Sequence, residues 1–133
     1  MKLTDITDIF DFSIAGYSKP SMYVNSYYMR VKEGHKNLSW KIYLMSPEDY
    51  LKNSFAITDI LKEELRELRE NILPATKWAL PVLDIYNKKG LGRGRALVCY
   101  KKDIKEIPVF VVYKDISPEV YFKERKIKFK LCD

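Results

Sequence analysis

Residues 88–95, KKGLGRGR, hold four cationic side chains and three of the chain's five glycines. Glycine allows a backbone to approach a ligand closely and to adopt conformations that other residues avoid. Guanidinium groups match the geometry of phosphate oxygens, and ammonium groups add point charges. The combination predicts a phosphate-binding loop made of Lys88, Lys89, Gly92, Arg93, Gly94 and Arg95.

The segments that flank this loop would place it at the start of a helix. Leu80–Tyr86 predicts a short apolar strand, Arg93–Lys102 predicts a helix with one buried face, and Ile107–Tyr113 predicts a buried strand. The first amides of a helix have no intrahelical partner and the helix dipole is positive there, so the junction would attract an anion. The spacing is neither that of a P-loop nor that of a dinucleotide-binding motif, and an arginine-rich hairpin turn at the surface is the alternative.

The rest of the chain alternates between helix and strand patterns without repeats or low-complexity tracts. Ser46, followed by a proline and two acidic residues, predicts the start of a short helix. The remaining expectations are a short helix or irregular arm ending at Gly16 and Pro20, a strand over Ser21–Val31, a turn over Glu33–Ser39, a strand over Trp40–Met45, a helix over Thr58–Ile72, and a last strand in which Ile127, Phe129 and Leu131 alternate with lysines.

The positive charge is concentrated in the last third of the chain. The 133 residues suit one domain and carry a net charge of +6. Residues 1–87 hold 11 Lys/Arg and 12 Asp/Glu, whereas residues 88–133 hold 13 and 6, so the net charges are −1 and +7. A localised basic segment favours a polyanionic partner such as DNA, and a soluble lysine-rich surface is the alternative. Lysines of the last strand would contact a polyanion or protect the sheet edge from aggregation, and these are Lys126, Lys128 and Lys130.

The order of these segments resembles the core of the ParB/sulfiredoxin-fold family. GRGRA at 92–96 is similar to the family's Gly-x-x-Arg motif at a helix start, IPVFVV at 107–112 to the strand that follows, and PVLDIY at 81–86 to the strand that precedes it. The resemblance covers residues 40–113 and implies that Gly92 and Arg95 hold a phosphate. Arg93 stands where sulfiredoxins have their catalytic cysteine, so thiol chemistry is not implied.

We therefore predict a single compact α+β domain with a small mixed sheet and flanking helices. It would consist of an N-terminal extension (1–39), available to a protein partner, a ParB/sulfiredoxin-like core (40–113) and a basic C-terminal strand (114–133). The predicted function is binding of DNA or a nucleotide, in a phage or mobile-element process. The alternative is a nucleotide-dependent phosphotransferase, NTPase or nuclease that uses Mg²⁺ bound with the nucleotide, and its candidate catalytic residues are Asp84 and Glu48.

Other polar side chains carry weaker signals. His35 is the only histidine and no metal site of protein ligands is expected, while Cys99 is expected in the core. The two cysteines, the lack of a signal-peptide pattern and the lack of a membrane-spanning apolar run predict a cytoplasmic protein without a membrane partner. Residues that could face the same site or stack on bases are Asp49, Asp115, Glu119, Tyr23, Tyr27 and Tyr28.

Overall fold

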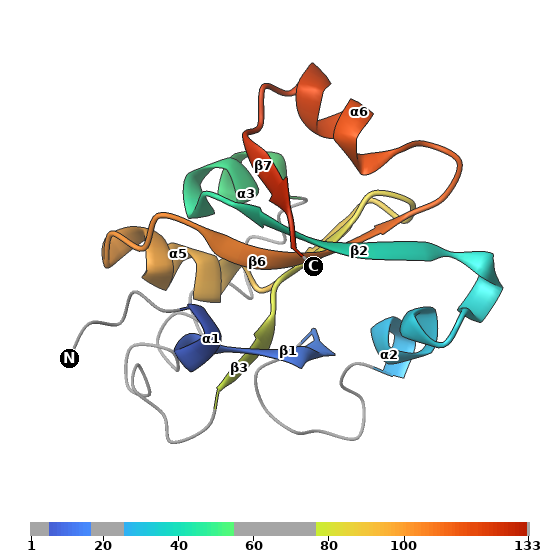
Figure 1. The fold of residues 1–133 in the computed structure, drawn as a ribbon, viewed down its shortest axis with the longest axis horizontal. Coiled ribbons are helices and arrows are strands. Elements are labelled where there is room, and N and C mark those ends of the chain that lie inside the picture. Colours follow the sequence, from blue (N-terminus) through green and yellow to red (C-terminus); the bar gives the residue numbers. More distant parts are fainter. Residues whose placement is uncertain (1–5, 17–25, 55–76, 133) are drawn as a thin grey trace.

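The apolar run Ile107–Tyr113 forms β6, the middle strand of a five-stranded sheet (Figure 1). The structure is a computed structural model and describes residues 6–16, 26–54 and 77–132. β6 is parallel to β4 on one side and antiparallel to β2 on the other, so the sheet is mixed. From edge to edge the strands are β5 (Lys89–Leu91), β4 (Val82–Asp84), β6, β2 (Ser39–Met45) and β7 (Phe129–Leu131).

Layers of structure cover both faces of this sheet. Ile42 pairs with Phe110 and Tyr43 with Val109, so Tyr43 and Phe110 point to opposite faces. Phe110 contacts the ring of Tyr28 from α2 (Ser26–Lys32) at 6.4 Å, measured between ring centroids. Tyr43 contacts Phe122 from α6 (Pro118–Glu124) at 5.1 Å. The protein is therefore a small α+β domain with a mixed sheet, as the sequence predicts.

Two short helices on the upper side of Figure 1 begin with the same signature. In α3 (Pro47–Asn53) the Ser46 hydroxyl accepts a hydrogen bond from the Asp49 amide at 3.0 Å. In α6 the Ser117 hydroxyl accepts from the Glu119 amide at 3.2 Å. Proline occupies the first helical turn in both cases, where its missing N–H costs nothing. The α3 helix was predicted from this signature, whereas α6 was missed although the sequence repeats it.

The N-terminal residues complete the core on the lower side of Figure 1. A short helix, α1 (Ile6–Ile9), leads into β1 (Phe10–Ala15), which pairs in parallel with β3 (Trp78–Leu80) as a separate two-stranded sheet. The Phe10 ring meets the Trp78 ring edge to face at 5.9 Å. A 3₁₀ turn, η1 (His35–Asn37), follows α2. Five of these N-terminal side chains belong to the buried hydrophobic cluster, namely Phe10, Ala15, Tyr28, Val31 and Leu38.

Several predicted boundaries differ from the observed ones. The described part of Ser21–Val31 is helix α2 rather than a strand, because Tyr28 and Val31, three positions apart, then both face the core. The first segment contains the short helix α1, as one of the two alternatives predicts, but it continues as the strand β1, which was not predicted. The predicted strand Leu80–Tyr86 is divided into β3 and β4 by Pro81. The predicted helix Thr58–Ile72 lies outside the described residues.

The C-terminal strand is shorter than the alternating pattern predicts. Lys126 lies in a turn with a φ of 56°, and β7 begins only at Phe129. Ile127 is buried, whereas Leu131 keeps 47% of its surface exposed. None of the helices in the described ranges is long and apolar enough to cross a bilayer.

Candidate functional site

Helix α5 (Arg93–Lys101) begins where the glycine–arginine loop predicts a helix start. Gly92 caps it in the left-handed conformation, with a φ of 96°. A Cβ atom at this position would lie 2.6 Å from Nη2 of Arg95 and 2.8 Å from Cα of Pro81. Glycine is therefore required twice, by its φ angle and by the close approach of β3–β4 to the helix start.

The guanidinium group of Arg95 lies under this glycine and is fully buried. Its Nη1 donates a hydrogen bond to the carbonyl oxygen of Ala79, in β3, at 2.8 Å. Gly92 and Arg95 thus fit together at the junction between β3 and α5. In this conformation Arg95 has no surface on which a ligand could bind, and its observed role is to hold that junction.

Arg93 also contacts the chain itself. Its Nη1 donates to the carbonyl oxygen of Leu51 at 2.7 Å and to that of Ser54 at 3.2 Å, and it contacts the Ser54 hydroxyl. These carbonyls lie at the C-terminal end of α3, where a helix has unsatisfied acceptors and a negative dipole end. Arg93 therefore joins the end of α3 to the start of α5, with Gly94 buried beside it.

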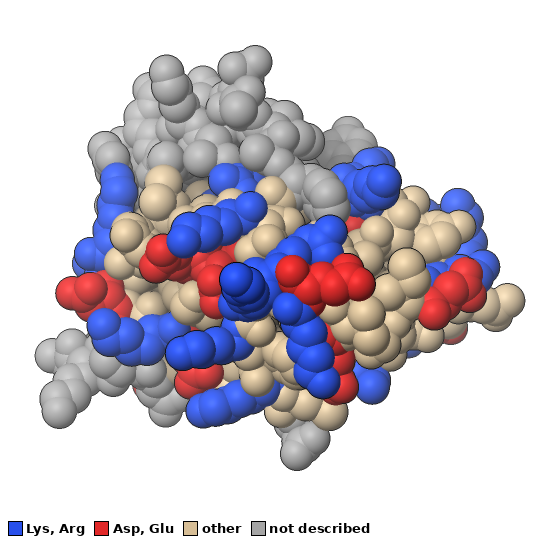
Figure 2. Space-filling view, turned by 90° about the horizontal axis from the view of Figure 1, so that it is seen from above, with Lys and Arg blue, Asp and Glu red and all other residues tan. Residues whose placement is uncertain are grey.

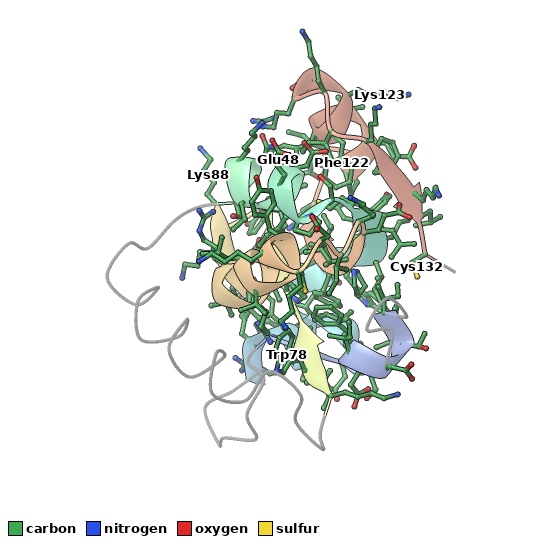
Figure 3. The ribbon with its side chains drawn as sticks, turned by 90° about the vertical axis from the view of Figure 1, so that its left-hand side faces the viewer. Glu48, Trp78, Lys88, Phe122, Lys123 and Cys132 are labelled. Carbon is green, nitrogen blue, oxygen red and sulfur yellow. The ribbon has the colours of Figure 1, made fainter. Side chains whose placement is uncertain are left out.

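The lysines of the predicted loop differ from its arginines in being exposed. Lys88 lies in the turn between β4 and β5, with a φ of 56°, and Lys89 begins β5. Lys88 lies on the outer side of the described residues in Figure 3. Of the six residues predicted to hold a phosphate, Lys88 and Lys89 are the exposed cations, whereas Arg93 is partly buried and Arg95 fully buried.

The two candidate catalytic carboxylates lie in different environments. Asp84 is fully buried at the end of β4, and its oxygens accept from the backbone amide and the side-chain amide of Asn87, at 2.8 and 2.9 Å. Glu48 is exposed on α3 and pairs with Lys52 at 2.9 Å. Within the described residues neither belongs to a group of three or more His, Cys, Asp or Glu side chains that could hold a metal ion. Because both of its hydrogen bonds come from Asn87, the observed role of Asp84 is to fix the β4–β5 turn.

The lysines predicted on the last strand are exposed but mixed with acidic groups. Lys126, Lys128 and Lys130, here called the β7 lysines, follow α6 at the sheet edge opposite β5. Lys130 lies 3.7 Å from the carboxylate of Glu106. Figure 2 shows Lys and Arg interleaved with Asp and Glu on the face seen from above. Charged side chains at a sheet edge oppose pairing with another chain, which is the second role predicted for these lysines.

Buried and aromatic groups complete the account of the predicted residues. Burial raises the pKa of the Cys99 thiol from 9.0 to about 12, so it stays protonated and unreactive near neutral pH. His35 meets the ring of Tyr27 at 6.0 Å. The pKa of Tyr27 is raised, mainly by burial and secondly by the nearby Asp84 carboxylate. Its hydroxyl accepts a hydrogen bond from the side-chain amide of Asn87, which links α2 to the β4–β5 turn.

Tyr86 and Lys114, which no sequence pattern singles out, lie at the same end of the sheet as the exposed loop lysines. Because β4 and β6 are parallel and Asp84 pairs with Val112, the residues that follow both strands come together. Tyr86 keeps 48% of its surface exposed, and Nζ of Lys114 lies 5.8 Å from the centre of its ring. The signal in the sequence was the strand–helix–strand unit, which implies a parallel pair. We define the Tyr86 surface as Tyr86, Lys88, Lys89 and Lys114.

Comparison with known proteins returned no match, whether against family models, curated proteins or solved structures. The similarity to ParB/sulfiredoxin-fold proteins consequently stays a prediction from the motif.

Proposed function

We propose that this protein binds nucleic acid through the exposed lysines at the end of its sheet where β4 and β6 finish. The observation that carries the proposal is that the exposed Tyr86 ring lies beneath the Lys114 ammonium, in the turn that leads directly to the exposed Lys88 and Lys89. Exposed lysines are able to neutralise phosphates and release counterions, which is the main source of nucleic-acid affinity.

The surrounding topology adds a further cation at the same end of the sheet. Ser39 pairs with Tyr113, so η1, which precedes β2, lies at the end where β6 finishes. η1 brings the exposed Lys36 there. Among the residues that the structure describes, the exposed acidic side chains adjoining these segments in the sequence are Glu33 and Asp115. Positive charge is thus in excess at this end, and such an excess attracts a polyanion over a Debye length.

The partner in this proposal is DNA, and the predicted nucleotide ligand shares its phosphate chemistry. The Gly92–Arg95 segment supports the binding surface indirectly, because it fixes α5 against β3 and α3. Arg93 and Arg95 are assigned no phosphate in this proposal. A nucleotide would be recognised by the same lysines, and competition by CTP or ATP distinguishes the two ligands.

The test is a salt titration of DNA affinity with two variants of equal charge. One replaces Lys88, Lys89 and Lys114 with alanine, and the other replaces the three β7 lysines with alanine. Each removes three positive charges from a net charge of +6. Fluorescence anisotropy with a labelled oligonucleotide gives the dissociation constant at several salt concentrations.

We expect the first variant to reduce the slope of log affinity against log salt by about 2 to 3, because each phosphate contact contributes about 0.7 to 0.9. The β7 variant should leave the slope within about one contact of the wild-type value. Equal losses in the two variants would show that affinity follows net charge alone, and the assigned surface would then be wrong. Absence of salt-dependent DNA binding in the wild type would reject the function.

A further inference from the structure

Tyr86 differs from an ordinary exposed aromatic residue in how firmly its turn is held. The Asp84 carboxylate accepts two hydrogen bonds from Asn87, which close the turn. The Ile85 amide donates to the carbonyl oxygen of Val112 at 2.9 Å, which extends the β4–β6 pairing one residue further. The turn that carries Tyr86 is therefore fixed to the central strand, and its ring is presented on a rigid support.

Charge and aromatic surface coincide at this turn. The Lys114 ammonium lies over the Tyr86 ring, and Lys88 and Lys89 follow Tyr86 two and three residues later. The ring nevertheless keeps about half of its surface exposed, at 48%. An exposed ring among cations is the arrangement that stacks on an unpaired base while phosphates on both sides are neutralised.

This chemistry favours single-stranded over double-stranded nucleic acid as the ligand. In duplex DNA each base is already stacked within the helix, and its faces are not available to a side chain. In single-stranded nucleic acid the base faces are accessible, and stacking on an aromatic ring adds free energy that electrostatics alone does not supply. A lysine cluster without the ring would favour the duplex, whose charge density is higher.

We propose that the Tyr86 surface binds single-stranded nucleic acid, with one base stacked on Tyr86 and the adjacent phosphates held by Lys88, Lys89 and Lys114. This inference rests on the proposed function and specifies its ligand. It assigns Tyr86 the role of discriminating single strands from duplex, and the lysines the role of general affinity.

A matched control exists on helix α5. Tyr100 is exposed to the same degree, at 50%, and is followed directly by Lys101 and Lys102. No contact of its ring with a cation is found among the described residues, and α5 packs on α3 rather than ending at the sheet. Replacing Tyr100 with alanine therefore removes an equivalent exposed ring outside the Tyr86 surface.

The experiment compares a fluorescein-labelled thymidine oligonucleotide with a duplex of the same length in anisotropy titrations. We expect Tyr86→Ala to weaken single-strand binding about 10-fold, because stacking of one base on an aromatic side chain contributes affinity of this order. Duplex binding should change less than about twofold, since the lysines remain. Tyr86→Phe should keep the single-strand affinity, and Tyr100→Ala should match the wild type. Circular dichroism and thermal melting confirm that each variant is folded.

Three results would overturn the inference. Unchanged single-strand affinity in Tyr86→Ala would show that the ring does not stack on a base. Equal loss for single strand and duplex would make Tyr86 a part of a general phosphate surface. An equal loss in Tyr100→Ala would remove the assignment to this turn. If the wild type binds neither ligand, the proposed function fails as well, so the two failures are distinguishable.

Discussion

Substitution of Gly92 tests the junction between the glycine–arginine loop and the rest of the fold. Gly34, at the start of η1, has a φ of 94° and Gly92 a φ of 96°, so both backbones are left-handed. They differ in their surroundings, because a Cβ at Gly34 would have no atom within 4 Å. The pair of variants Gly92→Ala and Gly34→Ala therefore separates backbone strain from packing.

The expected magnitudes follow from these surroundings. An alanine in the left-handed conformation costs about 1 to 2 kcal/mol at either position. At Gly92 the added methyl group would also lie 2.8 Å from Cα of Pro81, which is backbone and cannot rotate away, and 2.6 Å from Nη2 of Arg95. Overpacking of this kind adds about 1 to 3 kcal/mol. We expect a loss in free energy of unfolding of about 1 kcal/mol for Gly34→Ala and about 3 kcal/mol for Gly92→Ala.

Urea denaturation measures both values, provided that the m-value does not change between variants. Equal losses at the two glycines would refute the packing argument, since strain alone would then explain Gly92. DNA affinity gives a second readout. A Gly92→Ala variant with wild-type stability and lost DNA binding would mean that the segment contacts the ligand directly, contrary to the observed burial of Arg95.

Two other perturbations probe the core that supports this junction. The Tyr50 hydroxyl lies 2.6 Å from the carbonyl oxygen of Leu91 and 2.9 Å from that of Val82. Tyr50→Phe should therefore reduce the free energy of unfolding by about 1 to 2 kcal/mol without changing DNA affinity. A loss below about 0.3 kcal/mol in urea denaturation would contradict this role. Burial raises the pKa of Cys99 from 9.0 to about 12, so the folded state keeps a proton that the unfolded chain loses, and stability should fall by about 2 kcal/mol as the pH rises from 9 to about 10.5. Across this pH range the melting temperature should fall less for Cys99→Ala than for the wild type. An equal fall in the two proteins would contradict the raised pKa of Cys99.

Local signals in the sequence predicted the central elements of the fold. β6 was predicted over its full length, because a dense run of β-branched and aromatic residues marks a strand buried on both faces. The start of α5 was predicted at Arg93 by the glycine that precedes it. The Ser-Pro-acidic pattern predicted α3, and the same pattern at Ser117 would have predicted α6.

The misassigned segments depend on contacts between residues far apart in the sequence. Tyr28 and Val31 favour a strand by intrinsic preference, but their burial on one helix face, with the Tyr28 ring against Phe110, decides the conformation. β1 is short, and its pairing with β3 joins Phe10 to Trp78, which no local pattern reveals. In each case tertiary packing outweighs a propensity worth less than about 1 kcal/mol.

The candidate site shows a similar separation between what local sequence indicates and what the fold decides. A Gly-x-x-Arg segment has the same composition whether its guanidinium groups face a phosphate or a carbonyl oxygen. Here the acceptor for Arg93 is the end of α3, about forty positions earlier, and the acceptor for Arg95 is Ala79. Arginine suits both uses, because its planar set of donors stays charged when buried and binds several oxygens at once.

Lysine is the cation that remains available once the arginines are engaged. A compact ammonium on a flexible stem is strongly hydrated and costly to bury, so Lys88, Lys89 and Lys114 stay at the surface. The basic cluster read from the sequence therefore divides into an internal part, which holds α5 against β3 and α3, and an external part, which is free to meet an anion. Because Lys114 follows β6 and the exposed Tyr86 follows β4, the same parallel pairing of β4 and β6 that builds the sheet also brings a cation and a ring together at the proposed binding surface.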